Sequence, residues 1–523
     1  MFSPALAGID PQNHCGSVCL PLKRDMKLLV AIANYGYKND AFLARVLSEY
    51  RKMSFDTDIV VLSNVRKELG NDVKVLTGTP TRDPHSLPFG HKQVFAARRD
   101  DYDLFVYTED DILITQRNIE AFLEASNVLD PQELAGFFRW EEYPDGRRFF
   151  PDAHFFYRWL PGSVTAAGKT LFARFTNDHS GCFALTRGQL AKAIESGGFL
   201  VGPHEGMYSQ LETAATDPYT QCGFEKLICL SRFDDFLVHH LPNKYIGSPL
   251  GVDAAEFEVQ MQRLCDRWES PAATASLLEP RTKVFHCRWS KNCYEPRRDD
   301  LTGIYGPSVT SVLSIGCGWG ESEAAIEGRG IKVTAIPIDS VIAACAETRG
   351  VEVVCGEWDN AIRLLGGRRF DGVLMSGILH LLREPEKALQ QAAALLRHEG
   401  TLVATIPAFH RLPILWERLN HPSRYRDLGN FQRSGIHSVS RRLLRSWFRR
   451  AGLSKQKTFS NIPKRWTGIA GKAPRMAGPL LASEYVLVGR RTGTRATEFS
   501  PRTGAGLSEA ESDVTYTAER SAM

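Results

Sequence analysis

Apolar runs that end abruptly in glycine or acidic residues recur along the C-terminal half of the chain. The run Val312-Leu-Ser-Ile315 leads into Gly316-Cys-Gly-Trp-Gly320, which predicts a buried strand followed by a tight turn at which the backbone approaches a ligand. Similar runs predict strands over 332–339, 351–357, 370–376 and 398–407, with a helix that ends at Arg397. This alternation indicates a doubly wound sheet, although the glycine pattern taken alone is equally explained by a structural turn.

The N-terminal half shows a second set of apolar runs. They predict strands over 27–33, 58–63, 72–77 and 103–112, with helices over 40–50 and 89–99. The last of these strands ends in Glu109-Asp110-Asp111. Three consecutive carboxylates at the end of a buried strand are costly unless a cation compensates their charge, and a divalent cation takes oxygen ligands. The alternative is a solvated acidic turn.

The length of 523 residues predicts more than one domain, and the two sets of runs predict two α/β domains. A segment rich in proline, glycine and charge separates them and is expected to be a linker. The terminal segments lack periodic apolar residues. We therefore expect an irregular lead-in over 1–25, a first domain over 26–298, a linker over 299–307, a second domain over 308–491 and a disordered tail over 492–523.

Composition narrows the class of protein. A net charge of +4 is small for this length, so nucleic acid is not expected as a partner. The eleven scattered cysteines, the lack of an apolar run of about 20 residues and the interrupted N-terminus favour a cytoplasmic protein. Basic residues are dense over 441–475, where the hypotheses are peripheral contact with a membrane or anionic substrate, or a solvated helix face.

Residues from about 305 to 491 resemble the class I S-adenosylmethionine-dependent methyltransferases. Ile315-Gly-Cys-Gly-Trp-Gly320 is similar to the first motif of that family, and Leu395-Leu-Arg-His-Glu-Gly-Thr-Leu-Val403 is similar to its turn into the fifth strand. The resemblance implies a Rossmann-like doubly wound sheet that binds S-adenosylmethionine. It implies that the cofactor lies against Gly316, Cys317, Gly318 and Gly320.

The chain departs from that family where the ribose-binding acid is usual, because Pro337 stands there. Asp339 follows two residues later and would project to the same side of the strand, so it is the expected ribose ligand; its alternative is to cap the next helix. Glu357 stands where a family acid commonly faces the adenine. Trp358 beside it is expected either to stack on the base or to pack in the core.

Residues from about 26 to 290 resemble the GT-A glycosyltransferases, because Glu109-Asp110-Asp111 is similar to their Asp-x-Asp motif with glutamate in the first place. The resemblance implies a nucleotide-sugar donor and a Mn²⁺ or Mg²⁺ ion held by Glu109 and Asp111. In that family a late histidine often completes the metal site. His239 and His240 are the candidates, and adjacent residues of an extended segment point in opposite directions.

Candidate bases follow from position in the chain. In the C-terminal half, His380 after the fourth strand is the first candidate and His410 after the fifth is the second; the family often has another histidine where Leu381 stands here. In the N-terminal half the carboxylates between the acidic run and the histidine pair are candidates for activating an acceptor hydroxyl: Glu205, Glu212, Asp217 and Glu225.

These observations predict a bifunctional enzyme that modifies glycans. The N-terminal domain would transfer a sugar, and the C-terminal domain would methylate a hydroxyl of a glycan or lipid-linked glycan. In the main alternative only the methyltransferase is active and residues 26–290 bind glycan or act as a scaffold. A small metabolite or a protein as methyl acceptor is a third possibility. The sequence predicts no oligomeric state.

Overall fold

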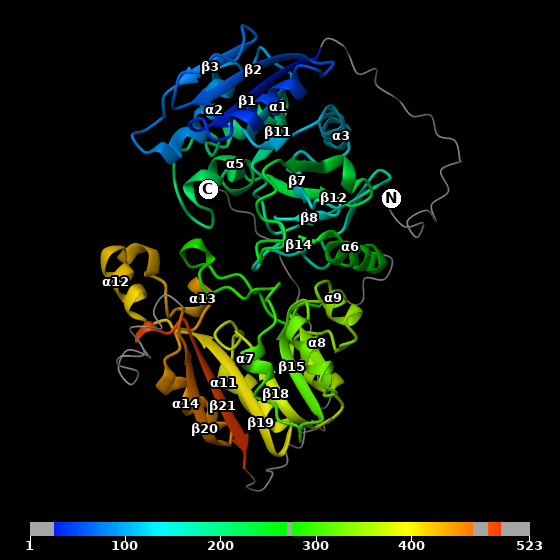
Figure 1. The fold of residues 1–523 in the computed structure, drawn as a ribbon, viewed down its shortest axis with the longest axis vertical. Helices are drawn as coiled ribbons and strands as arrows, with labels where there is room; N and C mark the ends of the chain where they lie inside the picture. Colours follow the sequence, from blue (N-terminus) through cyan, green and yellow to red (C-terminus); the bar gives the residue numbers. More distant parts are fainter. Residues whose placement is uncertain (1–25, 269–274, 464–479, 493–523) are drawn as a thin grey trace, which may run out of the picture.

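A computed structural model describes residues 26–268, 275–463 and 480–492, and it shows two α/β domains, one above the other in Figure 1. The expectations for 1–25 and for nearly all of 492–523 concern residues outside the described ranges. The N-terminal domain runs from blue to green in the figure, and the C-terminal domain runs from green to red.

The N-terminal domain contains a five-stranded sheet in the order β11-β4-β1-β2-β3. The first four strands along the chain are parallel, and β11 runs antiparallel to β4. Chain order reverses between β1 and β4, which is where doubly wound sheets bind ligands. The elements of this sheet and its neighbours are β1 (Lys27–Asn34), α1 (Asp40–Tyr50), β2 (Asp56–Ser63), β3 (Val73–Thr77), η2 (Pro84–Phe89), α2 (Gly90–Ala97), β4 (Leu104–Glu109), β11 (Cys182–Thr186) and α4 (Arg187–Glu195).

Two further sheets complete this domain, one of four strands in the order β6-β12-β10-β9 and one of five short strands in the order β14-β8-β7-β13-β5. The second one carries both candidate histidines on β13, which pairs with β5, the short strand directly after the acidic run. The elements are β5 (Ile112–Leu113), α3 (Gln116–Ser126), β6 (Glu133–Ala135), β7 (Phe138–Glu142), β8 (Arg148–Phe150), β9 (Thr165–Ala167), β10 (Thr170–Ala173), α5 (Gln210–Thr220), β12 (Glu225–Cys229), η3 (Phe233–Phe236), β13 (Leu237–His240), β14 (Val252–Asp253) and α6 (Ala254–Trp268).

The C-terminal domain is built on a seven-stranded sheet in the order β17-β16-β15-β18-β19-β21-β20. Chain order reverses between β15 and β18, directly beside the glycine turn. Only β21 runs against its neighbours. The strands are β15 (Ser311–Cys317), β16 (Lys332–Pro337), β17 (Glu352–Val353), β18 (Phe370–Met375), β19 (Leu396–Pro407), β20 (Leu453–Asn461) and β21 (Glu484–Arg491).

Helices cover both faces of this sheet, because its strands are apolar on both sides. One face packs against α10, α11 and α14, and the other packs against α7, α8 and α9. The helical elements of this half are η5 (Phe285–Cys287), α7 (Asp299–Thr302), α8 (Glu321–Glu327), α9 (Ala343–Thr348), α10 (Trp358–Leu364), α11 (Pro385–Ala394), α12 (Leu412–Asn420), η6 (Pro422–Tyr425), α13 (Phe431–Ser434) and α14 (Arg441–Arg450).

The two domains share a hydrophobic core. Phe138 and Phe257 of the N-terminal domain belong to the same buried cluster as Ile338, Val341 and Ile342 of the C-terminal domain. Helix α6 packs against α9, and Arg349 at the end of α9 donates to Glu256 on α6 at 2.6 Å. The domains are therefore joined by packed side chains as well as by the chain.

The expected linker over 299–307 is folded into the C-terminal domain. Leu301 and Tyr305 are buried in the core between α7, α8 and the sheet. The polar composition of this segment arises from its exposed face, which carries Asp299 and Asp300. The chain that joins the domains lies earlier, and residues 275–295 are called the connecting segment below.

Candidate functional site

The glycine turn follows β15 as the sequence predicts. Gly316 and Gly320 have φ angles of +82° and +92°, which disfavour other residues. A Cβ on Gly316 would lie 2.4 Å from Cγ2 of Ile378, and one on Gly320 would lie 2.7 Å from Cβ of Ala346. Both glycines thus allow the turn to pack closely against the segment that follows β18 and against α9.

The third glycine packs against the connecting segment. A Cβ on Gly318 would lie 2.1 Å from the carbonyl oxygen of Cys293, and the backbone N–H of Trp319 donates to that same oxygen at 3.0 Å. The indole Nε1–H of Trp319 donates to the carbonyl of Glu295. The close backbone approach that the sequence predicts is present, but the approaching group belongs to this chain.

Little space remains over the turn. The cavity lined by Gly316–Gly320, Lys291, Glu295 and Ser376 has a volume of about 20 Å³, which is room for about one water molecule. Lys291 and Glu295 form an ion pair at 2.6 Å across it, and Ser376 donates to Glu295 at 3.2 Å. In this conformation the residues around the turn do not leave room for S-adenosylmethionine.

Asp339 lies at the end of β16, but both of its carboxylate oxygens have partners within the protein. Oδ1 accepts from the backbone N–H groups of Val341 and Ile342, at 2.9 and 3.0 Å. Oδ2 accepts from Nε of Arg158 in the N-terminal domain at 2.8 Å. Its backbone also bridges to Ser276 of the connecting segment. The two bonds to Val341 and Ile342 agree with the alternative in which Asp339 caps the next helix. The ion pair with Arg158 was not predicted.

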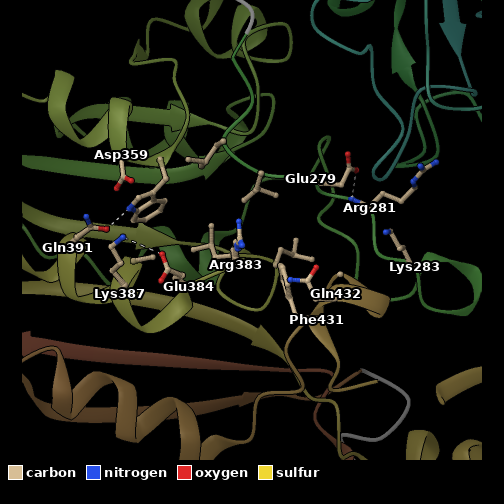
Figure 2. A pocket seen from close by; sticks show the side chains of 17 residues that line it. Glu279, Arg281, Lys283, Asp359, Arg383, Glu384, Lys387, Gln391, Phe431 and Gln432 are labelled. Carbon is tan, nitrogen blue, oxygen red and sulfur yellow. Dashed lines mark hydrogen bonds and ion pairs between the residues drawn. The ribbon is translucent and has the colours of Figure 1, made fainter. Parts of the chain in front are cut away.

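Glu357 and Trp358 begin α10. Glu357 is exposed, and the indole Nε1–H of Trp358 donates to Gln391 on α11 at 2.6 Å. Trp358 lines a cavity of about 480 Å³ between α10, α11 and the connecting segment. Figure 2 shows this cavity, with Glu279, Arg281 and Lys283 on the side opposite Asp359, Lys387 and Gln391.

The two candidate histidines of this domain lie in different surroundings. His380 is buried against Phe409, and its Nε2–H donates to the carbonyl of Trp289 at 2.8 Å, which leaves Nδ1 without a hydrogen-bond partner among the described residues. Burial lowers the pKa of His380 to about 4, so the ring is neutral at pH 7. His410 is exposed after β19, and partial burial lowers its pKa.

In the N-terminal domain, the acidic run lies at the point where chain order reverses. Glu109, Asp110 and Asp111 line a cavity of about 500 Å³ together with Asn39 and His85. Asp110 accepts hydrogen bonds from the side-chain amides of Asn34 (2.6 Å) and Asn39 (2.8 Å). These two asparagines were not predicted as site residues. Oδ1 of Asp111 is buried and has no hydrogen-bond partner among the described residues.

His240 lies beside the acidic run and His239 does not. Nε2 of His240 is 3.6 Å from Oδ2 of Asp111, while Nδ1–H donates to Glu141 at 2.5 Å. Burial lowers the pKa of His240, but Asp111 and Glu141 outweigh it, so the pKa is raised overall. His239 stacks on Trp140 with ring centroids 4.3 Å apart. The two rings therefore point in different directions, as predicted for adjacent residues of a strand.

Burial controls the charge of the acidic run. It raises the pKa of Glu109 to about 8, with a further contribution from Asp111, and raises that of Asp110 to about 6. Burial also raises the pKa of Asp111, but His240 outweighs it and the pKa is lowered. Among residues 26–268, 275–463 and 480–492, no three His, Cys, Asp or Glu side chains are grouped to hold a metal ion.

The candidate bases of the N-terminal half all have partners inside the protein. Glu212 completes a capping box at the start of α5, accepting from the backbone N–H of Ser209 at 2.9 Å. Asp217 is buried and ion-paired with Lys92. Glu205 pairs with Arg424, and Glu225 pairs with Arg174. Sequence spacing did not reveal the three ion pairs, because each partner is distant in the chain, whereas the capping box of Ser209 and Glu212 has the local Ser-x-x-Glu spacing that could have revealed it.

The basic helix α14 holds its arginines on the surface. Arg450 forms an ion pair with Glu386, and Arg445 donates to Thr458 at 3.0 Å. Arg442, Arg445 and Arg449 line an open hollow of about 520 Å³. The remaining basic residues of the predicted region, over 464–475, lie outside the described ranges. Within the described ranges, no helix has the length and apolar character needed to cross a bilayer.

Comparison with known proteins assigns the C-terminal region. Residues 296–458 match the family model described as a methyltransferase domain. The match begins beside the glycine turn and ends in β20, so it spans the sheet edge described above. No curated protein sequence matches the chain.

Solved structures of methyltransferases are similar to part of the chain. A SAM-dependent methyltransferase from Archaeoglobus fulgidus is 16% identical, covering 37% of this chain and 91% of its own, with a TM-score of 0.29. An S-adenosylmethionine-dependent methyltransferase from Mesorhizobium loti is 13% identical (37% and 96% covered, TM-score 0.28). An O-methyltransferase family protein from Burkholderia thailandensis is 18% identical (38% and 55% covered, TM-score 0.27).

The family match confirms the expected resemblance of the C-terminal half to methyltransferases and supports S-adenosylmethionine-dependent methyl transfer as its chemistry. It does not extend into residues 26–295, so the resemblance of the N-terminal half to GT-A glycosyltransferases rests on the acidic run and its cavity. Residues 296–458 therefore match a methyltransferase domain, and the chain extends beyond that match.

Proposed function

We propose that the chain is a bifunctional enzyme in which the C-terminal domain methylates a hydroxyl of a glycan and the N-terminal domain transfers a sugar from a nucleotide-sugar. The observation that carries the first activity is the family match over the sheet edge with the glycine turn. The second rests on the carboxylates that line a cavity at the reversal point of the N-terminal sheet.

For the methyltransferase domain, S-adenosylmethionine supplies the methyl group when it is bound. The neutral ring of His380 retains an unshared pair on Nδ1 at pH 7, which is the state required of a general base. His380 is buried, so an acceptor hydroxyl reaches it only after the covering chain moves; exposed His410 is the second candidate.

For the N-terminal domain, the cavity beside the acidic run is the proposed donor site. Asp111 would hold a divalent cation through the buried Oδ1 atom that has no hydrogen-bond partner among the described residues, with Glu109 as a second oxygen ligand. The ion would neutralise the diphosphate leaving group. His240 is the histidine placed to join this set, and His239 is not.

A donor-hydrolysis assay with Mn²⁺ and a panel of nucleotide-sugars tests the second activity. We expect turnover by the full chain and its loss in Asp111→Asn. Asp145→Asn, in an exposed turn of the same domain, is the control and should be as active as the parent protein. Absence of turnover with every donor, or equal turnover by Asp111→Asn, would remove the sugar-transfer proposal.

Two observations favour a second candidate function, in which only the methyltransferase domain is catalytic. The described residues hold no preformed group of metal ligands, and the four candidate bases are engaged in capping or ion pairs. Residues 26–290 would then bind glycan as a recognition module. Glycan binding by the full chain without donor turnover, measured on a glycan array, would favour this function over sugar transfer.

A further inference from the structure

The edge of the C-terminal sheet at which doubly wound proteins bind ligands is covered by the chain's own connecting segment. Its first part follows the end of β16: the N–H of Leu277 donates to the carbonyl of Ile338 at 2.8 Å, and the N–H of Ser340 donates to the carbonyl of Ala275 at 3.1 Å. Together with the bridge from Ser276 to Asp339, these bonds add an extra strand-like stretch at this edge.

Two apolar side chains anchor this first part. Leu277 and Leu278 are 8% and 9% exposed and join the core cluster that contains Ile336, Ala361 and Ile378. Ile378 is the residue that packs on Gly316. The leucines also line the cavity that contains Trp358, Leu381 and Leu382, so they fill apolar space between the end of β16, α10 and the residues that follow β18.

The second part of the connecting segment covers the turn itself. The carbonyl of Cys293 accepts from Trp319 and contacts Gly318, while Lys291 and Glu295 close the space above Ser376. The backbone N–H of Trp319, within the turn, is therefore already hydrogen-bonded to the connecting segment.

A buried ion pair connects this covering to the other domain. Arg158 and Asp339 have side chains that are 4% and 0% exposed, and Arg158 also lies 3.5 Å from Glu279 of the connecting segment. A ligand that used Asp339 would first have to replace Arg158, since both carboxylate oxygens are engaged.

We infer that residues 275–295 are an intrasteric inhibitor of the methyltransferase domain: they occupy the S-adenosylmethionine edge, and the cofactor binds only when Leu277 and Leu278 leave it and Arg158 releases Asp339. This inference rests on the proposed function of the domain. The open form is the one in which the connecting segment has left this edge. A ligand that binds only the open form has an apparent Kd equal to its intrinsic Kd divided by the fraction of open protein. The connecting segment therefore sets the fraction of the protein that can bind. The N-terminal domain, through Arg158, controls that fraction.

The test measures the affinity of the full chain for S-adenosylhomocysteine by calorimetry, together with hydrogen exchange at the Ser340 amide. The variant Leu277→Asp/Leu278→Asp places two charges in the apolar space and should release the segment. Val128→Asp, at an exposed apolar position of the N-terminal domain, is the matched control. We expect loss of Ser340 protection and at least a tenfold tighter affinity in the double variant, with no change in the control.

Two results would overturn the inference while leaving the methyltransferase assignment intact. One is equal, measurable affinity in the parent and the double variant although Ser340 has lost protection. The other is tight binding by the parent protein with Ser340 still protected in the complex. If neither protein binds while Ser340 is deprotected in the variant, the proposed cofactor use itself is wrong, and the inference falls with it.

Discussion

Arg158 of the N-terminal domain donates from Nε to Oδ2 of Asp339 at 2.8 Å, and the side chains of both residues are almost fully buried. The ion pair joins the end of β16 to the other domain at the position where the sequence predicts a cofactor ligand. One contact therefore links the packing of the two domains to the residue that is the predicted cofactor ligand.

The ion pair predicts a large effect of removing one partner. Arg158→Met leaves the Asp339 carboxylate buried without its cation, which costs about 3–5 kcal/mol of unfolding free energy. Arg263→Met removes a more exposed pair with Glu347 between α6 and α9, and should cost about 1 kcal/mol or less. Urea unfolding of both variants measures the difference, and equal losses would contradict the structural role assigned to Arg158.

Replacing Gly316 by alanine should destabilise the protein through side-chain packing as well as through backbone conformation. Gly316→Ala and Gly330→Ala have similar native φ angles, +82° and +78°, but only the first places a Cβ against Ile378. The Gly330 variant should lose about 1 kcal/mol, and the Gly316 variant about 1–3 kcal/mol more. Unfolding of both proteins, and of Gly316→Ala combined with Ile378→Ala relative to Ile378→Ala alone, measures the packing part, because alanine removes the Cγ2 atom that the new Cβ would meet. No recovery in the combined variant would show that the clash is not its cause.

His380 predicts a pH dependence of stability. Its pKa is about 4 in the folded protein and about 6.5 in an unfolded chain, so the unfolded state takes up a proton first as the pH falls. Stability is therefore lost between about pH 6.5 and 4, by up to about 3 kcal/mol from this residue.

His380→Gln removes that proton uptake, so unfolding free energies measured at pH 7.5 and 4.5 should differ less in the variant than in the parent protein. His410→Gln, at an exposed site, should alter the pH dependence less. If His380→Gln retains the full pH dependence of the parent, the buried neutral state of His380 is wrong.

The proposed role of Asp111 as a metal ligand predicts how the affinity of the protein for Mn²⁺ responds to substitution. Asp111→Asn should weaken Mn²⁺ binding by about 10- to 100-fold or more, because a carboxylate ligand is replaced by a neutral amide. Titration calorimetry with Mn²⁺ alone measures this without any donor. His239→Gln should leave the affinity unchanged, since its ring stacks on Trp140 away from the acidic run. An affinity that responds to His239 and not to Asp111 would refute the proposed ligand set.

The sequence predicted the architecture better than the sites. Apolar periodicity located most strands of both large sheets, because buried parallel strands are apolar on both faces. It missed β20, which is mostly polar and forms the edge of the sheet. Leu301 and Tyr305 are buried in a segment whose charge favoured a linker, since composition does not show which face of a short helix is covered.

The site predictions were limited by distant contacts. The role of Asp339 depends on Arg158, and the space over Gly318 depends on Cys293; neither pairing leaves a signal in local spacing. The opposed directions of His239 and His240 were predictable, because strand side chains alternate. Which of them faces Asp111 depends on the pairing of β13 with β5, and is seen only in the fold.

Photo-crosslinking of labelled S-adenosylmethionine to the full chain and to Leu277→Asp/Leu278→Asp, followed by peptide mapping, tests the central claim most directly. We expect that label enters peptides containing Gly316–Gly320 or Asp339, that unlabelled S-adenosylhomocysteine prevents it, and that labelling is stronger in the double variant. Labelling confined to residues 26–268, or no competable labelling of either protein, would contradict the assignment of the methyl-donor site to the glycine turn.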